Sequence, residues 1–490
     1  MSESLDPSGS AITVDSSVTL RTPGLTGEAI YHAPAVPGTR SQPFGTQAFE
    51  GALSEASVAE EEAVEIEADQ EPPLPGGTRA ADAQRTIELE VDPPPADQGQ
   101  FVLHSDESGV ITWSFAPAQT AVRDRRRTYV IRTNQPQEGA TEGTRGLIST
   151  LGTKLLRVMV FPLVDPIIGR VADFFAAEWE KHYRPYRIRS FTPDSYLGLP
   201  PADDHIDWSQ LGQGRALLMI HGTGSQAHTG FAGLPRTYLE DLHRAYGGRV
   251  FALDHPTLSV TPQKNIEWFF SQVPDGSKLD LDIVCHSRGG LVARVLAEKQ
   301  NEFSLGSRAV SVNKIIFVAA PNAGTILTDA NYMSDYLDSY TNLLNFFPDT
   351  AVLDTLQAVI AVAKQLAVGA FKGLDGLESM LPTGNFLQWL NVGARTRAPG
   401  AATRYFALAS NYEPTQPGLK LWAENRLLDD IFKADNDLVV PTAGVYAGNG
   451  AASFPIDEHV VFDQSRGVPH SGYFANEDAR TQIADWLNRN

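Results

Sequence analysis

Ser287 lies at a sharp junction between an expected strand and an expected helix. The apolar run 281–285 leads into His286-Ser287-Arg288-Gly289-Gly290, and apolar residues recur at helical spacing directly afterwards. A serine on such a turn projects its hydroxyl beyond the carboxyl end of the strand, and the tight backbone needs small neighbours. Gly289 meets that need on one side, and Cys285 stands where a second glycine is usual. The segment predicts a nucleophilic serine. A helix cap at Ser287, or Cys285 as the nucleophile, is the alternative.

A serine hydroxyl is a poor nucleophile at neutral pH, so it needs a base to take its proton. Two histidines near the C-terminus are candidates. His470 lies in a Gly/Pro-containing loop before an amphipathic last helix, whereas His459 opens a short β run. Because a loop lets the imidazole reach over the edge of a sheet, His470 is the predicted base and His459 the alternative.

Five apolar runs must form the scaffold that positions these groups. They lie at residues 216–220, 249–254, 281–285, 314–320 and 404–410, and helical segments separate them. Continuous apolar runs bounded by Gly, Pro and Ser are typical of parallel strands that are buried on both faces. The sequence therefore predicts an α/β architecture with a mostly parallel central sheet.

With the turn at Ser287 on this scaffold, the sequence resembles the α/β-hydrolase superfamily, in particular bacterial lipases and esterases with an HSxGG nucleophile elbow. The resemblance covers about 290 residues at the C-terminal end. The segment 434–444, ADNDLVVPTAG, resembles the part of these lipases that carries the catalytic aspartate. It implies Asp437 as the acid, with Asp435 as the alternative. The order Ser287, Asp437, His470 matches the nucleophile, acid, base order of the fold.

The resemblance also implies an oxyanion hole and a substrate-binding region. His221-Gly222-Thr223-Gly224 follows the first run and resembles the lipase oxyanion loop, so the implied donors are the backbone N–H groups of Thr223 and Arg288. The turn at 321–325 resembles a second lipase turn. The residues expected to contact substrate are His221, Gly222, Gly224 and Asn322.

Other polar residues near these motifs have weaker claims to a role. His286 is expected to pack beneath the elbow, and Asp254-His255-Pro256 to make structural hydrogen bonds at the end of a strand. His228 and Ser225 are expected to line the oxyanion loop without taking part in the chemistry.

A long insertion separates the runs 314–320 and 404–410. Residues 326–403 are too many for a simple crossover, and they include an apolar helical stripe around residues 350–371. An insertion at this point of the fold is expected to lie above the nucleophile as a lid or acyl pocket. Packing of the stripe on the core is the alternative.

Three further units are expected before the catalytic domain at 201–490. Residues 1–80 carry 13 acidic residues, three arginines, no lysine and eight prolines, which predicts a disordered acidic tail. Alternating patterns predict a small β module at 81–135, and apolar segments predict a helical connector at 136–200. The arginines at 123–127 are expected to form a solvated face or to pair with the tail.

Composition limits the partners of the chain. With 39 basic and 59 acidic residues the formal net charge is −20, which opposes binding to nucleic acid or to an anionic membrane. The single cysteine fits no disulfide or multi-cysteine zinc pattern, so no metal and no cofactor are expected. The N-terminus lacks the features of a signal peptide, and charges interrupt the apolar stretch at 155–175, so we expect a cytoplasmic protein without a transmembrane segment. A protein partner for the tail is an alternative, and the sequence leaves the oligomeric state open.

Together these features predict a serine hydrolase that cleaves carboxylic esters, with lipid-like or other apolar acyl groups, through an acyl-enzyme. An amidase, thioesterase or acyltransferase would use the same residues. The alternative from another class is a non-catalytic scaffold or signalling protein built on the same fold.

Overall fold

The computed structural model describes most of the chain. The described residues are 2–33, 46–70, 86–116, 126–132, 152–165, 170–171, 175–199, 206–347, 352–370, 373–391, 403–425, 431–447 and 455–489. They form a mixed α/β chain with three principal sheets, of which one is mostly parallel and two are antiparallel.

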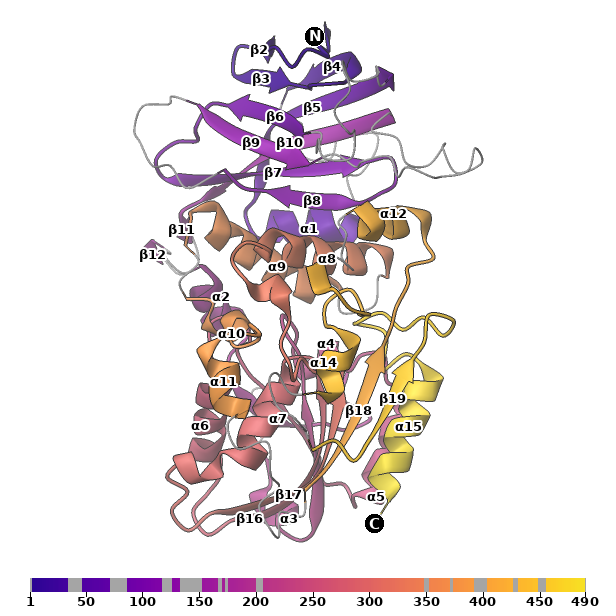
Figure 1. The fold of residues 1–490 in the computed structure, drawn as a ribbon. Coiled ribbons are helices and arrows are strands. Elements are labelled where there is room, and N and C mark those ends of the chain that lie inside the picture. The colour runs from indigo at the N-terminus through magenta and orange to yellow at the C-terminus, as the bar shows by residue number, and fades with distance from the viewer. Residues whose placement is uncertain are drawn as a thin grey trace.

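A seven-stranded sheet runs through the lower part of the molecule in Figure 1, in the order β13-β15-β14-β16-β17-β18-β19. Neighbouring strands are parallel except β13 and β15. The five apolar runs correspond to β14 to β18, and β13 and β19 add the two edges. The strands are Arg187–Ser190 (β13), Arg215–Ile220 (β14), Val250–Asp254 (β15), Lys278–His286 (β16), Ala309–Val318 (β17), Arg404–Ser410 (β18) and Glu458–Phe462 (β19).

Alternate residues of these strands pack into two hydrophobic cores, one on each face of the sheet. In β14, Leu218 and Ile220 belong to the core formed with α6 (Pro262–Gln272) and α7 (Gly289–Glu298). Leu217 and Met219 belong to the core formed with α5 (Arg236–Ala245) and α15 (Glu477–Asn488). Because successive strand residues point to opposite faces, covering both faces requires the unbroken apolar runs seen in the sequence.

Two antiparallel sheets form the upper part of the molecule in Figure 1. The six-stranded sheet has the order β1-β4-β5-β10-β7-β8, and the four-stranded sheet has the order β2-β3-β6-β9. Apolar residues of both, such as Ile66 and Val158 from one and Leu20 and Leu89 from the other, share one buried core, so the sheets make a sandwich. The strands are Ser2–Ser4 (β1), Ile12–Asp15 (β2), Val18–Arg21 (β3), Thr26–His32 (β4), Ala59–Gln70 (β5), Thr86–Val91 (β6), Gln98–Asp106 (β7), Ile111–Ser114 (β8), Arg127–Arg132 (β9) and Gly152–Pro162 (β10).

The prediction of a disordered tail at 1–80 is wrong for the described part of that segment. Residues 2–33 and 46–70 contribute five strands and helix α1 (Gln47–Glu55). In β5 the buried residues Val64 and Ile66 alternate with the partly exposed Glu65 and the exposed Glu67. Glu65 and Glu67 therefore lie on the side of the strand opposite Val64 and Ile66, and averaging the charge over a long window hid that period. Residues 34–45 and 71–85 lie outside the described residues.

The prediction of a helical connector is wrong at residues 152–162, which form β10 between β5 and β7. Its buried Arg157 forms ion pairs with Glu50 at 2.6 Å and Glu60 at 2.5 Å, and these partners come from segments far away in the sequence. Among the described residues of 136–200, the helical prediction is right at α2, Phe175–Tyr183. The β module expected at 81–135 contributes β6 to β9, and these strands share sheets with strands from both neighbouring segments. Residues 123–125 of its arginine run lie outside the described residues.

The insertion between β17 and β18 is mainly helical, and its longest helices lie between the sandwich and the parallel sheet (Figure 1). Helix α9, Val352–Ala367, covers the predicted apolar stripe, and α8, Met333–Phe346, precedes it. The remaining elements are Val164–Asp165 (β11), Arg170–Val171 (β12), Trp208–Leu211 (α3), Ala227–Gly230 (α4), Gln300–Glu302 (η1), Ile326–Thr328 (η2), Asp375–Glu378 (α10), Asn385–Asn391 (α11), Pro417–Asn425 (α12) and Thr442–Tyr446 (α14).

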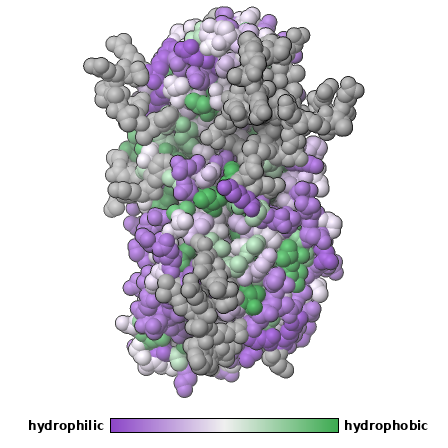
Figure 2. All heavy atoms as spheres, viewed as in Figure 1, coloured by the Kyte–Doolittle hydropathy of each residue, from purple (hydrophilic) through white to green (hydrophobic). Residues whose placement is uncertain are grey.

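The described surface drawn in Figure 2 is largely hydrophilic, with hydrophobic residues gathered in small separate patches. Within the ranges given above, no helix combines the length and the apolar character needed to cross a membrane.

Candidate active site

Ser287 occupies a strained turn between β16 and α7. Its φ of 51° lies in the left-handed region, which is costly for a residue with a side chain. A Cβ on Gly289 would lie 2.5 Å from the carbonyl oxygens of Ile220 and His221, and a Cβ on Gly222 would lie 2.7 Å from the Ser287 Cβ. Only glycine fits at both positions, because strand β14 and the turn approach each other so closely.

The structure brings Ser287, His470 and Asp437 together. Nε2 of His470 lies 3.0 Å from the Ser287 hydroxyl, and Nδ1 of the same ring lies 2.8 Å from Oδ2 of Asp437. Since a carboxylate only accepts, Nδ1 carries the ring proton and Nε2 is free to accept the serine proton. Backbone N–H groups of Val439 and Val440 donate to Oδ1 of Asp437 at 3.1 and 2.8 Å, which fixes the carboxylate.

The alternative residues lie elsewhere. Asp435 is exposed, and its backbone carbonyl accepts a hydrogen bond from Thr442. His459 is exposed on β19 and stacks on Tyr446, with ring centroids 4.1 Å apart. Cys285 is fully buried in β16, and burial raises the pKa of its thiol well above the usual value, which opposes the thiolate form needed for attack.

The two expected oxyanion donors are the backbone N–H of Thr223 in the oxyanion loop and that of Arg288 in the serine turn, and both are available to a ligand. Among the described residues, no protein acceptor takes a hydrogen bond from the N–H of Thr223 or of Arg288. The Arg288 side chain is fully buried and points to other partners, donating to the Gly376 carbonyl at 2.8 Å and to the Val260 carbonyl. Burial lowers the pKa of that guanidinium to about 10. The chemistry available at Arg288 is therefore that of its backbone.

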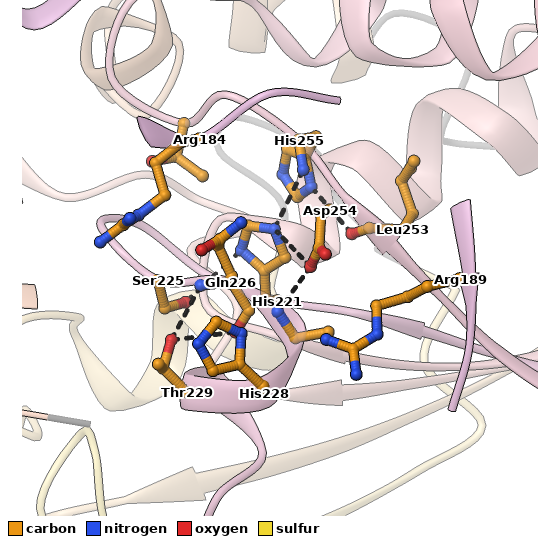
Figure 3. Close-up of polar contacts among 12 residues, drawn as sticks. Arg184, Arg189, His221, Ser225, Gln226, His228, Thr229, Leu253, Asp254 and His255 are labelled. Atoms are coloured by element: carbon orange, nitrogen blue, oxygen red, sulfur yellow. Dashed lines mark hydrogen bonds and ion pairs between the residues drawn. The ribbon is translucent and has the colours of Figure 1, made fainter. Parts of the chain in front are cut away.

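Two buried histidines, His221 and His255, support the oxyanion loop (Figure 3). Nε2 of His221 accepts from the backbone N–H of His255 at 3.1 Å, so its proton lies on Nδ1 and is donated to the Gly222 carbonyl at 3.0 Å. The rings are stacked with centroids 4.2 Å apart, and burial lowers the pKa of His221 to about 4. Next to them, Asp254 accepts from the Ala227 N–H at 2.7 Å. His221 is therefore a neutral support of the loop, and its predicted contact with substrate stays a prediction.

The other residues expected at or near the oxyanion loop have polar partners within the protein. Asn322 is fully buried and donates to the Val445 carbonyl at 2.7 Å, and its contact with substrate stays a prediction. Gly224 has φ of 70° and donates its N–H to the Thr257 hydroxyl at 3.0 Å. Ser225 donates to the Gly222 carbonyl at 2.9 Å, and His228 pairs with Asp354 of α9 at 3.3 Å.

His286 lies beneath the elbow, as the sequence predicts. Its Nε2 donates to the His470 carbonyl at 2.9 Å, and its ring centroid lies 5.7 Å from that of Phe474. Burial lowers the pKa of His286 to about 3, which keeps the ring neutral. His286 therefore joins the serine turn to the histidine loop.

The insertion covers the nucleophile, and sequence reasoning missed the residues that do so. The ring centroid of Tyr340 in α8 lies 6.2 Å from that of His470, and the Tyr340 side chain is a near neighbour of the Tyr336, Ser287 and Thr223 side chains. Ser287 is only 2% exposed. The YLDSY spacing of 336 and 340, one helical turn apart in the insertion, is the signal that could have identified this pair.

Apolar groups also lie against the oxyanion loop. A Cβ on Gly224 would lie 3.3 Å from the Ala358 Cβ of α9, and Met380 places its sulfur 3.9 Å from the Thr223 hydroxyl. Among the described residues, no group of three or more His, Cys, Asp or Glu side chains is arranged to hold a metal ion.

The family described as "Domain of unknown function (DUF7379)" matches residues 183–488, which is more than half of the chain. The chain therefore belongs to this family. No curated protein matches it in sequence.

Solved structures give weak similarities. The lipase BlEst2 of Bacillus licheniformis is 13% identical with a TM-score of 0.34, over 62% of this chain and 97% of that chain. Lipase 1 from Pelosinus fermentans is 13% identical with a TM-score of 0.39, over 56% and 99%. The enol-lactonase from Burkholderia xenovorans LB400 is 11% identical with a TM-score of 0.32, over 62% and 96%. Scores at this level assign no activity to the chain.

Proposed function

We propose that the chain is a serine hydrolase with an α/β-hydrolase-type catalytic domain, and that it cleaves carboxylic esters through an acyl-enzyme on Ser287. One observation carries the proposal: a single imidazole, His470, hydrogen-bonds the Ser287 hydroxyl with one nitrogen and the Asp437 carboxylate with the other. This arrangement can take a proton from the serine and hold the resulting imidazolium beside a negative charge.

The first half-reaction follows from these contacts. The Ser287 Oγ attacks the ester carbonyl carbon while its proton moves to Nε2 of His470. The electron pair of the carbonyl π bond moves to oxygen, and the N–H groups of Thr223 and Arg288 donate to that oxyanion. When the intermediate collapses, the bond to the alcohol oxygen breaks and His470 returns the proton to the leaving alcohol.

Water completes the cycle. The oxygen of a water molecule attacks the acyl carbon while His470 takes a proton from that water. The tetrahedral intermediate then expels Ser287 Oγ, which regains its proton from His470. Asp437 remains ionised throughout and keeps the ring in the productive tautomer. The chain needs no metal or cofactor for these steps in the proposed reaction.

The lining of the oxyanion loop favours an apolar acyl group. The Ala358 methyl and the Met380 sulfur are adjacent to it, and both come from the insertion. We propose residues 201–490 as the catalytic unit, with 326–403 as a lid-like insertion. Since Ser287 is almost fully buried, a part of this insertion other than α8 must move to admit substrate. Amides, thioesters and acyl transfer remain candidate chemistries of the same residues. The cytoplasmic location and the boundaries of the N-terminal units stay predictions.

A fluorophosphonate probe tests the proposal, because it forms a covalent bond only with an activated nucleophile. We expect the wild-type protein and Cys285→Ala to be labelled, and Ser287→Ala to remain unlabelled. An unlabelled wild-type protein that also fails to hydrolyse nitrophenyl esters would favour the scaffold alternative. Labelling lost in Cys285→Ala but kept in Ser287→Ala would move the nucleophile to the thiol.

A further inference from the structure

Helix α8 presents different groups on its opposite sides. Tyr336 and Tyr340 are four residues apart and share one side, whereas Asp338 and Asn342 follow each of them by two positions. Two positions correspond to about 200° around an α-helix, so the second pair lies on the opposite side. The helix is buried almost all round, and therefore both sides have protein contacts.

The polar side of α8 completes the edge of the six-stranded sheet. Strand β8 lies at the end of that sheet, so half of its backbone groups have no strand partner. Asn342 Oδ1 accepts from the Ile111 N–H at 2.9 Å, and its Nδ2 donates to the Ile111 carbonyl at 2.8 Å. Asp338 accepts from the Trp113 N–H at 2.8 Å, and Thr341 accepts from the Trp113 indole at 2.9 Å.

These contacts fix the helix in rotation and in position along its axis. Asn342 recognises both backbone groups of Ile111, and Asp338 recognises the next outward-facing N–H, so a shift by one residue would leave buried polar groups unpaired. The N-terminal sandwich thus determines where the opposite side of α8 points.

That opposite side meets the reacting groups. The Tyr340 side chain is a near neighbour of Ser287, which supplies the nucleophile, and of Thr223, whose backbone N–H has no acceptor in the described chain. The ring lies edge-on to His470 at an interplanar angle of 77°. A hydroxyl beside both Ser287 and Thr223 is close to the place where the carbonyl oxygen of a substrate must enter.

We propose that Tyr340 is a catalytic residue of the hydrolase: its hydroxyl is a third donor to the oxyanion, presented to the site by the N-terminal sheet through α8. The inference rests on the proposed function. As the Ser287 Oγ bonds to the carbonyl carbon and its proton passes to His470, the negative charge that forms on the carbonyl oxygen accepts a hydrogen bond from Tyr340. No proton leaves Tyr340.

The state of the hydroxyl suits this role. Burial raises the pKa of Tyr340 to about 12, so the group stays protonated, and able to donate, through the neutral and mildly alkaline range. Tyr336 packs against it with ring centroids 4.8 Å apart and holds the ring in place.

The test compares Tyr340→Phe with the wild-type protein on a nitrophenyl ester. Loss of one oxyanion donor typically lowers kcat by about 10² to 10³, and we expect a fall of this size with KM little changed and the same pH profile. The matched control is Tyr196→Phe, which removes another buried hydroxyl whose 2.9 Å bond goes to the Leu234 carbonyl, away from the site. We expect the control to keep wild-type kcat.

The outcomes separate this inference from the proposed function. A wild-type level of kcat in Tyr340→Phe, or a rise in KM alone, overturns the donor role while leaving the hydrolase intact. A wild-type protein that neither turns over esters nor reacts with a fluorophosphonate overturns both. If Tyr340→Phe does not fold, a crystal structure of the wild-type phosphonate adduct decides: the phosphoryl oxygen lies within hydrogen-bond distance of the Tyr340 hydroxyl, or the inference is wrong.

Discussion

The substitution Asp437→Asn should abolish most of the activity without unfolding the protein, because of the way the carboxylate is held. Its Oδ1 accepts the backbone N–H groups of Val439 and Val440, and its Oδ2 accepts Nδ1–H of His470. In an asparagine, the two backbone donors require the oxygen at the Oδ1 position, so the NH₂ group must face His470. The ring then accepts at Nδ1 and carries its proton on Nε2, where it cannot take the proton of Ser287.

The expected loss is about 10⁴ in kcat, which is the effect of the wrong tautomer in serine triads and corresponds to roughly 5 kcal/mol of transition-state stabilisation. The assay is steady-state hydrolysis of nitrophenyl esters, with thermal unfolding measured in parallel. Asp435→Asn is the matched control, since Asp435 is exposed two residues away. A kcat for Asp437→Asn within tenfold of the wild type, or a larger loss in Asp435→Asn, would refute the reasoning.

Two further predictions concern stability. Asn342→Ala removes both hydrogen bonds to the buried backbone of Ile111 and should destabilise the fold by about 1–3 kcal/mol, measured by urea unfolding. An equal effect of Asn331→Ala, at an exposed position, would argue that the contacts between α8 and β8 add no particular stability. Stability should also fall on acidification: burial lowers the pKa of His221 to about 4 and that of His286 to about 3, so below about 6.5 the unfolded chain binds protons that the folded chain does not. The stability present above pH 6.5 is then lost progressively towards pH 4, and an unfolding free energy that stays flat or rises between pH 6.5 and 5 would contradict this.

The parallel sheet was predictable because its strands are buried on both faces. Burial of this kind produces unbroken apolar runs such as 281–285, and such a run can be recognised from a few adjacent residues of the sequence. The positions of Ser287, Asp437 and His470 followed from motifs tied to the ends of those strands. The structure places both Ser287 and Asp437 within hydrogen-bonding distance of His470.

The sandwich was missed because its strands obey a weaker local signal. From Val64 to Asp69 in β5, acidic residues alternate with apolar ones, and a composition window reports only their charge. In β10 the buried Arg157 depends on Glu50 and Glu60, which are distant in sequence, so nothing local indicates how its charge is compensated. Antiparallel pairings of this kind are decided by tertiary contacts rather than by propensity.

The covering of the site by α8 could not be predicted either. The tyrosines at 336 and 340 are typical of a helical face in the sequence, and the direction in which that face points depends on tertiary contacts such as those of Asp338 and Asn342 with β8. These contacts join segments more than 220 residues apart in sequence.

Peptide mass spectrometry of the wild-type protein after reaction with a fluorophosphonate tests the central claim most directly. The proposed chemistry predicts one phosphonate per chain, on the peptide that contains Ser287, with attachment at that serine. Modification of a different residue, or an unmodified protein after prolonged reaction at neutral pH, would contradict it.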